Sequence, residues 1–275
     1  MLTALSMPLA AGWEWFQFHW LLFFVCGLFG LFYFVAPLVI LVQQRFEARP
    51  RMIRFDPRDF ELPPEIDKLF TTSVADLSNL GFEVVDGLFL PSAVPNVQTA
   101  LLLLVNRTDK DAAIVTAVYA TSGSPSSAKS LYVEYSSRFN DGFEYNTNNT
   151  THLPSFPARN KVKTLQLVEI ADSAKLYRIH EAVMKSDGRS SSQKVLQLDR
   201  EFGGDSVAFL QHGMQEEFES AAGYGYLSLT PNGEKYRPTI KGAFLVVWKE
   251  LWPWKLIRKY QRSRRARSVL SKLAM

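Results

Sequence analysis

Side chains that commonly carry out nucleophilic or metal chemistry are few in this sequence, and none stands at a recognisable spacing. Cys26 is the only cysteine, so a zinc-thiolate site and an internal disulfide are both excluded. His180 and Glu181 begin an H-E-x-x-H pattern, but Met184 occupies the position of the second histidine. The glycine-rich and nucleophile-elbow motifs of phosphate sites and hydrolases are also missing. The sequence therefore predicts no metal centre, no cofactor and no catalytic residue.

One polar stretch could form a ligand site, because loops on a rigid scaffold often carry function. Its candidate residues lie at and beyond the end of a predicted strand and are Arg138, Asn140, Asn148 and His152. An enzyme acting on a lipid or another membrane-proximal substrate could use the same region, together with Tyr132 and Tyr135. An exposed loop without a ligand is the alternative for residues 146–152.

A helix predicted over residues 205–222, followed by a hairpin and a basic segment, has the element order of a winged helix. This helix carries Glu216, Glu217 and Glu219 and no lysine or arginine, whereas groove binding requires the phosphates to be neutralised. Nucleic-acid binding is therefore an alternative that the charges oppose. We expect the three glutamates to form a solvated face of the helix.

The apolar pattern predicts an α+β domain over residues 65–240, with an antiparallel, meander-like sheet and packed helices. Apolar residues at spacings of three and four predict helices over residues 64–80, 172–187 and 205–222. Runs of strand length occupy residues 82–90, 97–105, 112–121, 131–139 and 162–170, and residues 226–239 form a hairpin. Consecutive apolar residues at 101–105 predict a strand that is covered on both faces.

An uncharged apolar stretch precedes this domain and predicts a single transmembrane helix over residues 18–43. Residues 18–42 contain no Lys, Arg, Asp or Glu, and as a helix they would reach about 37 Å, longer than a hydrocarbon core of about 30 Å. Trp13, Trp15 and Trp20 stand where aromatic side chains favour the headgroup level, and Arg45 and Arg49 follow the far end. A cleaved signal peptide needs a basic leading segment and a shorter apolar run, so we expect this helix to be retained.

The distribution of charge predicts the orientation of the helix. No Lys or Arg precedes Arg45, whereas residues 44–64 form a basic, proline-rich linker. The positive-inside rule therefore puts residues 1–17 outside the cell and the domain in the cytoplasm, and we expect the inner membrane of a bacterium. Three N-glycosylation triplets, at Asn106, Asn148 and Asn149, would favour the opposite orientation, although such triplets often arise by chance.

The C-terminal segment, residues 241–275, carries ten basic residues and one acidic residue. A helix lying in the membrane interface is predicted here, because the segment combines tryptophans with basic residues and its apolar part is too short to span a bilayer. The residues predicted to contact the interface and anionic headgroups are Trp248, Trp252, Trp254, Lys255, Arg258, Lys259 and Arg262. The alternative is that the aromatic side chains pack on the domain's own sheet and the basic residues form a solvated tail.

These features together predict a single-pass membrane protein whose cytoplasmic domain is a binding or scaffold module without chemistry of its own. A membrane anchor raises the local concentration of such a module for partners at the same surface. The predicted partners are the lipid bilayer and its anionic headgroups, and a protein partner is compatible with the same pattern. An enzyme or a ligand-binding domain with a concave polar site is the competing hypothesis.

Overall fold

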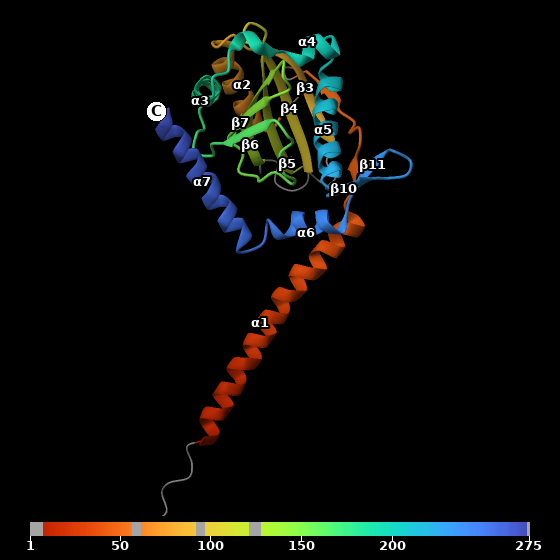
Figure 1. Cartoon of the computed structure of the whole chain (residues 1–275), viewed down its shortest axis with the longest axis vertical. Helices are drawn as coiled ribbons and strands as arrows, with labels where there is room; N and C mark the ends of the chain where they lie inside the picture. Colours follow the sequence, from red (N-terminus) through yellow and green to blue (C-terminus); the bar gives the residue numbers. More distant parts are fainter. Residues whose placement is uncertain (1–7, 57–61, 92–96, 121–127, 274–275) are drawn as a thin grey trace, which may run out of the picture.

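The computed structural model describes residues 8–56, 62–91, 97–120 and 128–273. A long N-terminal helix, α1 (Pro8–Gln43), projects from an α+β domain (Figure 1), so the predicted fold class is confirmed. Within the described residues, one stretch of α1, His19–Gln43, is long and apolar enough to cross a membrane. Almost all of that stretch is exposed, unlike the core helix of a soluble domain, which would be covered by its own protein.

The main sheet of the domain is largely an antiparallel meander, as predicted. Its strands run in the order β2 (Ile53–Phe55), β3 (Glu83–Pro91), β4 (Val97–Asn106), β5 (Asp111–Ala120), β6 (Ala128–Phe139), β7 (Glu144–Asn148) and β8 (Val162–Gln166). The pair β7 and β8 is parallel, and a parallel pair needs a crossover connection rather than a hairpin. Residues 149–161 provide this connection, which we call the crossover loop.

Helices cover both faces of this sheet. α2 (Pro64–Ser78) and α3 (Ser173–Ser186) pack on one face, and α4 (Gln197–Phe202) and α5 (Ser206–Gly223) cover the other. Alternate residues of β4 point to the two faces: Leu102 and Leu104 belong to the core with α2 and α3, whereas Leu103 packs with Leu198 of α4. The expectation that consecutive apolar residues are covered on both faces is therefore confirmed.

The segment after α1 is not a free linker, contrary to the expectation for residues 44–64. β1 (Phe46–Glu47) pairs with β11 (Lys235–Pro238), and β2 pairs with β3 at the edge of the main sheet. β11 also pairs with β10 (Leu227–Leu229), which confirms the predicted hairpin. A further short strand, β9 (Lys194–Val195), follows a 3₁₀ turn (Ser191–Gln193) and pairs with β6. Residues 57–61 of the predicted linker lie outside the described residues.

Two C-terminal helices form the base of the domain, where α1 joins it (Figure 1). α6 (Ile240–Trp248) packs against α1, and α7 (Trp254–Lys272) then rises along the side of the domain. Ala266 of α7 is buried, and Val269 and Leu270 pack against the core that α2 and α3 share. The C-terminal segment is therefore not a free tail, because this helix is held against the domain by its apolar side, while Arg264, Arg265 and Arg267 are exposed to solvent.

Candidate functional site

A polar cavity of about 900 Å³ lies on the face of the sheet that α5 covers. Its walls are β6, β7 and β8, the crossover loop, one side of α5 and part of α7. Strand pairing brings polar residues into one row, because Glu134 lies opposite Asn148, which in turn lies opposite Gln166. Side chains alternate between the two faces of a strand, so this row shares the face beneath α5.

Glu134 gives the cavity a carboxyl group that holds its proton near neutral pH. Burial is the main cause, and with the nearby Glu217 it raises the pKa of Glu134 to about 7. The pKa of Glu217, which lines the cavity from α5, is also raised, chiefly by desolvation. Within the described residues neither carboxyl group forms an ion pair, so this side of the cavity favours a proton or a bound cation.

Two amide oxygens in the same wall have no hydrogen-bond partner in the described part of the chain. Asn146 donates to Glu144 and Asn148 donates to Glu134, yet the Oδ1 atoms of both asparagines are buried and accept nothing. A buried acceptor that is left unpaired costs about 1–3 kcal/mol. A bound molecule that supplies the missing donor is one reason for a protein to keep such groups, so this row of amides is a candidate ligand contact.

An ion-pair cluster fixes the crossover loop and α5 to the sheet. Arg159 of the loop pairs with Glu144 of β7 at 2.8 Å and with Glu216 of α5, and Arg138 of β6 pairs with Glu216 at 3.0 Å. Burial opposes ionisation of Glu216, but the hydrogen bond from Arg138 and the charge of Arg159 lower its pKa overall. Both guanidinium groups are therefore neutralised already, and they position the walls of the cavity.

α7 presents a row of arginines to the cavity, Arg258, Arg262 and Arg265, whose spacing of four and three puts them on one side of the helix. Arg262 Nη1 donates to the carbonyl oxygen of Thr151 at 3.1 Å, which ties α7 to the crossover loop. None of the three forms an ion pair with a residue that the structure describes. The cavity thus has unpaired positive charge on its α7 wall and unpaired carboxyl groups on its sheet and α5 walls.

The structure brings together part of the polar site that the sequence predicts. Asn148 and His152 line the cavity, as does Tyr132, and Arg138 lies beside it in the ion-pair cluster. Asn140 is exposed in the turn between β6 and β7 and does not line the cavity.

Three expectations about this region need correction. Tyr135 points to the opposite face of the sheet, where it is fully buried in the core. Residues 146–148 belong to strand β7 rather than to an exposed loop. The glutamates of α5 do not form a uniformly solvated face, because Glu216 is paired with arginines and Glu217 lines the cavity.

Sequence reasoning also missed Glu134, Glu217 and the arginine row of α7 as one site. In residues 144–148, Glu144, Asn146 and Asn148 alternate with Tyr145 and Thr147, which is the pattern of a strand with one polar face. This alternation was a usable signal for one wall of the site.

A second polar cluster lies on the other face of the sheet, where its side chains are buried. His180 bonds to Ser137 Oγ at 2.8 Å and to Thr147 Oγ1 at 2.9 Å, and the Ser137 hydroxyl donates to Asp111, which also pairs with Lys194 at 2.7 Å. Burial, with the charge of Lys194 as the second cause, lowers the pKa of His180 to about 3. A serine–histidine pair is the arrangement of a nucleophile and its base, but these side chains are enclosed in the core and serve to hold α3 and β9 on the sheet.

Another cavity, of about 860 Å³, lies between α2 and the β2–β3 edge. Arg54 in its wall is already paired, because it bonds to Asp86 and to Asp205, each at 2.8 Å. It adjoins residues 57–61, which lie outside the described residues, so it carries no argument about function.

The residues predicted to contact a membrane lie on α1 and at the base of the domain. Trp20 is exposed on α1, whereas Trp13 and Trp15 belong to the part of α1 whose side chains are outside the described set. Arg45 donates to carbonyl groups at the end of α1, and Arg49 follows β1.

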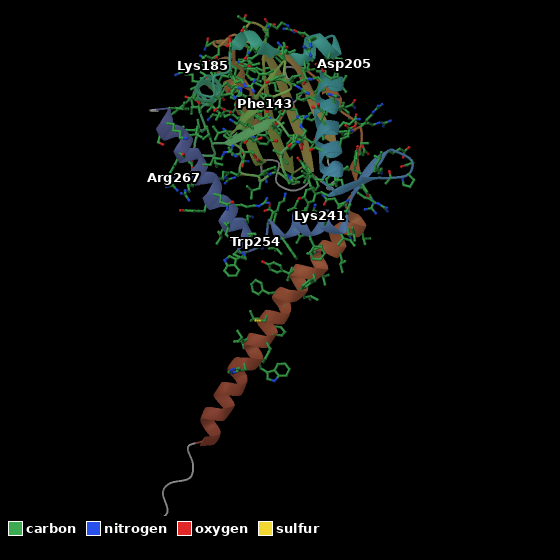
Figure 2. The ribbon with its side chains drawn as sticks, viewed as in Figure 1. Phe143, Lys185, Asp205, Lys241, Trp254 and Arg267 are labelled. Carbon is green, nitrogen blue, oxygen red and sulfur yellow. The ribbon has the colours of Figure 1, made fainter. Side chains whose placement is uncertain are left out.

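The C-terminal residues that were predicted to contact the membrane lie in two different environments. Trp248, Trp252 and Trp254 are exposed, and Trp254 lies at the base of the domain (Figure 2), so the alternative that they pack on the domain's own sheet is wrong. Lys255 and Lys259 are exposed beside them, whereas Arg258 and Arg262 line the cavity.

The three glycosylation triplets give no support to the opposite orientation. Asn106 and Asn148 are buried, at 1% and 5% exposure. Asn149 accepts a hydrogen bond from the backbone of Val133 and donates one to Ile170, so its amide is also engaged by the fold.

The described residues contain no group of three or more His, Cys, Asp or Glu side chains placed to hold a metal ion. Comparisons of the chain with protein-family models, with curated proteins and with solved structures found no match in any of the three. The chemistry of the cavity and the apolar helix α1 are therefore the features from which a function can be proposed.

Proposed function

We propose that this protein is a membrane-anchored ligand-binding domain whose cavity accepts a small zwitterion. The observation that carries the proposal is the presence of opposite, unpaired charges on the walls of one cavity: carboxyl groups at Glu134 and Glu217, and guanidinium groups on α7. The volume of about 900 Å³ falls within the range of about 300–1,000 Å³ that is typical of small-molecule sites.

A ligand with an ammonium group and an anionic group would satisfy both sides of the cavity. The ammonium group would bind at Glu134 in place of the carboxyl proton, and it could donate a further hydrogen bond to the unpaired amide oxygen of Asn148. A phosphate or carboxylate would pair with Arg258 and Arg265 of α7, where charge-assisted hydrogen bonds are about twice as strong as neutral ones. The ligand could be a lipid headgroup or a free solute with the same chemistry.

The proposal includes the orientation in which α1 crosses the membrane with its N-terminus outside and the domain in the cytoplasm. The arginines that follow α1, beginning with Arg45, support this orientation by the positive-inside rule. A reporter that is active only in the cytoplasm, fused after Met275 of the full chain, should give a signal. Activity of a reporter that works only outside the membrane would contradict this part of the proposal.

The other candidate functions make different predictions. A scaffold without a ligand would bind none of the small probes below, and a nucleic-acid binder would need basic residues on α5, where Glu216 and Glu217 stand instead.

The proposal is tested by calorimetric titration of the detergent-solubilised full chain with phosphoethanolamine, which carries both charges. We expect phosphoethanolamine to bind more tightly than ethyl phosphate or ethanolamine, each of which lacks one charge. Glu134→Gln should weaken binding by about tenfold or more, because a hydrogen bond to a charged group contributes about 1.5–3 kcal/mol.

The matched control is Glu219→Gln, which changes an exposed glutamate of the same helix that carries Glu217. This variant should leave binding unchanged. Equal binding of phosphoethanolamine and ethyl phosphate, or unchanged binding in Glu134→Gln, would contradict the role of the carboxyl wall.

A further inference from the structure

The base of the domain exposes apolar side chains at the junction of α6 and α7. We call residues 240–260 the elbow. Its exposed apolar residues are Ile240, Trp248, Trp252, Trp254, Leu256, Ile257 and Tyr260, and Trp252 and Leu256 are 65% and 57% exposed. A continuous group of this kind on a folded domain marks a surface that is covered by a membrane or by another molecule.

Contacts with α1 fix the level of the elbow along that helix. Trp248 Nε1 donates to the carbonyl oxygen of Tyr33 at 3.0 Å, and the Tyr33 hydroxyl donates to the carbonyl oxygen of Trp252. Phe244 of α6 meets Phe34 of α1 edge to face, with ring centroids 6.3 Å apart. The elbow therefore lies beside Tyr33, which is well inside the apolar stretch His19–Gln43 rather than beyond its end.

The apolar stretch of α1 extends past the level of the elbow. The helix continues for ten residues after Tyr33, which is about 15 Å along its axis, and Leu38 and Val42 are exposed in that part. A bilayer that covers the exposed apolar side chains of α1 therefore reaches the elbow as well.

The charge beside the elbow indicates the type of lipid surface. Lys255 and Lys259 are exposed in the first turns of α7, next to the exposed tryptophans. Each basic residue close to an anionic leaflet contributes favourably to binding, and the combination of tryptophan with basic residues is typical of interfacial helices. The second half of α7 is packed against the core through Ala266, so the elbow is a fixed surface and not the end of a free tail.

We infer that the elbow is embedded in the headgroup region of the leaflet next to the domain, and that the occupant of this surface is anionic lipid. The domain is held at the membrane by two elements, α1 across the bilayer and the elbow along its surface. This inference does not depend on the proposed ligand of the cavity.

The test uses the full chain in vesicles of phosphatidylcholine and phosphatidylglycerol, with Cys26→Ala to remove the only cysteine. Trp252→Cys and, separately, Leu256→Cys carry an environment-sensitive fluorophore. The control is Lys185→Cys, an exposed position at the end of the domain far from α1 (Figure 2). Nitroxide groups on lipid headgroups should quench both elbow probes more than twofold relative to the control probe, and aqueous iodide should quench them less than the control.

A nitroxide on phosphatidylglycerol should quench the elbow probes more than the same nitroxide on phosphatidylcholine. Equal quenching by the two labelled lipids would overturn the assignment to anionic lipid. Iodide quenching of both elbow probes to the level of the Lys185 probe would overturn the membrane contact. Shielding of both probes from iodide and from lipid nitroxides would overturn it as well, because a second copy of the chain or another protein would then cover the elbow.

Discussion

The carboxyl group of Glu134 should make the stability of the protein depend on pH in a way that a single substitution removes. Its pKa is raised from 4.5 to about 7 in the folded protein. Between these two pH values the folded state keeps a proton that the unfolded state has released, so stability falls as the pH rises through this window. A difference of about 2.5 pH units at about 1.36 kcal/mol per unit gives a cost of about 3 kcal/mol above pH 7.

Glu134→Gln replaces the carboxyl group with a neutral amide of nearly the same shape. We expect the variant to match the native protein at pH 3.5, about one unit below the lower of the two pKa values, where Glu134 is largely neutral in both states, and to exceed its stability by about 3 kcal/mol at pH 8. The assay is thermal unfolding of the detergent-solubilised full chain across this pH range. A gain of this size corresponds to an increase in Tm of about 6–12 °C for a domain of roughly 200 residues.

Glu219→Gln is the control, since Glu219 is exposed on α5 and its substitution should shift Tm equally at all pH values. If Glu134→Gln changes Tm by the same amount at pH 5 and at pH 8, the pKa of Glu134 is not raised in the folded state and the prediction is wrong.

Three further predictions concern the core and the base of the domain. The lowered pKa of His180 means that stability should fall as the pH drops from 6.5 towards 3, by about 1.4 kcal/mol per unit, and His180→Gln should flatten this acid limb of the Tm profile. Lys194→Met should destabilise the fold by about 3–5 kcal/mol, because it leaves the fully buried Asp111 carboxylate without its positively charged partner. Adding Asp111→Asn to this variant should recover much of the lost stability in a denaturation experiment. Gly242→Ala should lower Tm, because the added Cβ would lie 1.9 Å from the backbone carbonyl oxygen of Tyr226. Gly213→Ala is the control and should not lower Tm, because a Cβ at that position meets open space.

The elements that depend on local signals could be predicted from the sequence. The Asn140-Asp141-Gly142 turn between β6 and β7 needs a positive φ, which Gly142 supplies at 78°. The helix that begins at Pro64 could be recognised from its apolar spacing and from proline in its first turn.

The elements that depend on distant partners could not be predicted in the same way. β1 and β2 are short and charged, and they become strands only because β11 and β3 offer them free edges. A helix was predicted in the C-terminal segment, but the packing of α7 on the domain was not, although Ala266, Val269 and Leu270 have helical spacing, since the excess of basic residues around them resembles a solvated tail.

The candidate site illustrates the same distinction. Asn148 and His152 could be singled out because they belong to a polar stretch that follows the strand predicted to end at Phe139, but nothing local connects them with Arg265, which reaches the cavity from the far end of the chain. The importance of Glu134 follows from its burial and from the approach of Glu217, and both of these are consequences of how α5 lies across the sheet.

The most direct test of the account is the number of protons released when phosphoethanolamine binds. Titration calorimetry at pH 7, in two buffers of different ionisation enthalpy, measures this number for the native chain and for Glu134→Gln. With a pKa of about 7, Glu134 is about half protonated, so the native chain should release about half a proton more than the variant. Identical proton release from the two proteins would contradict the claim that an ammonium group displaces the proton of Glu134.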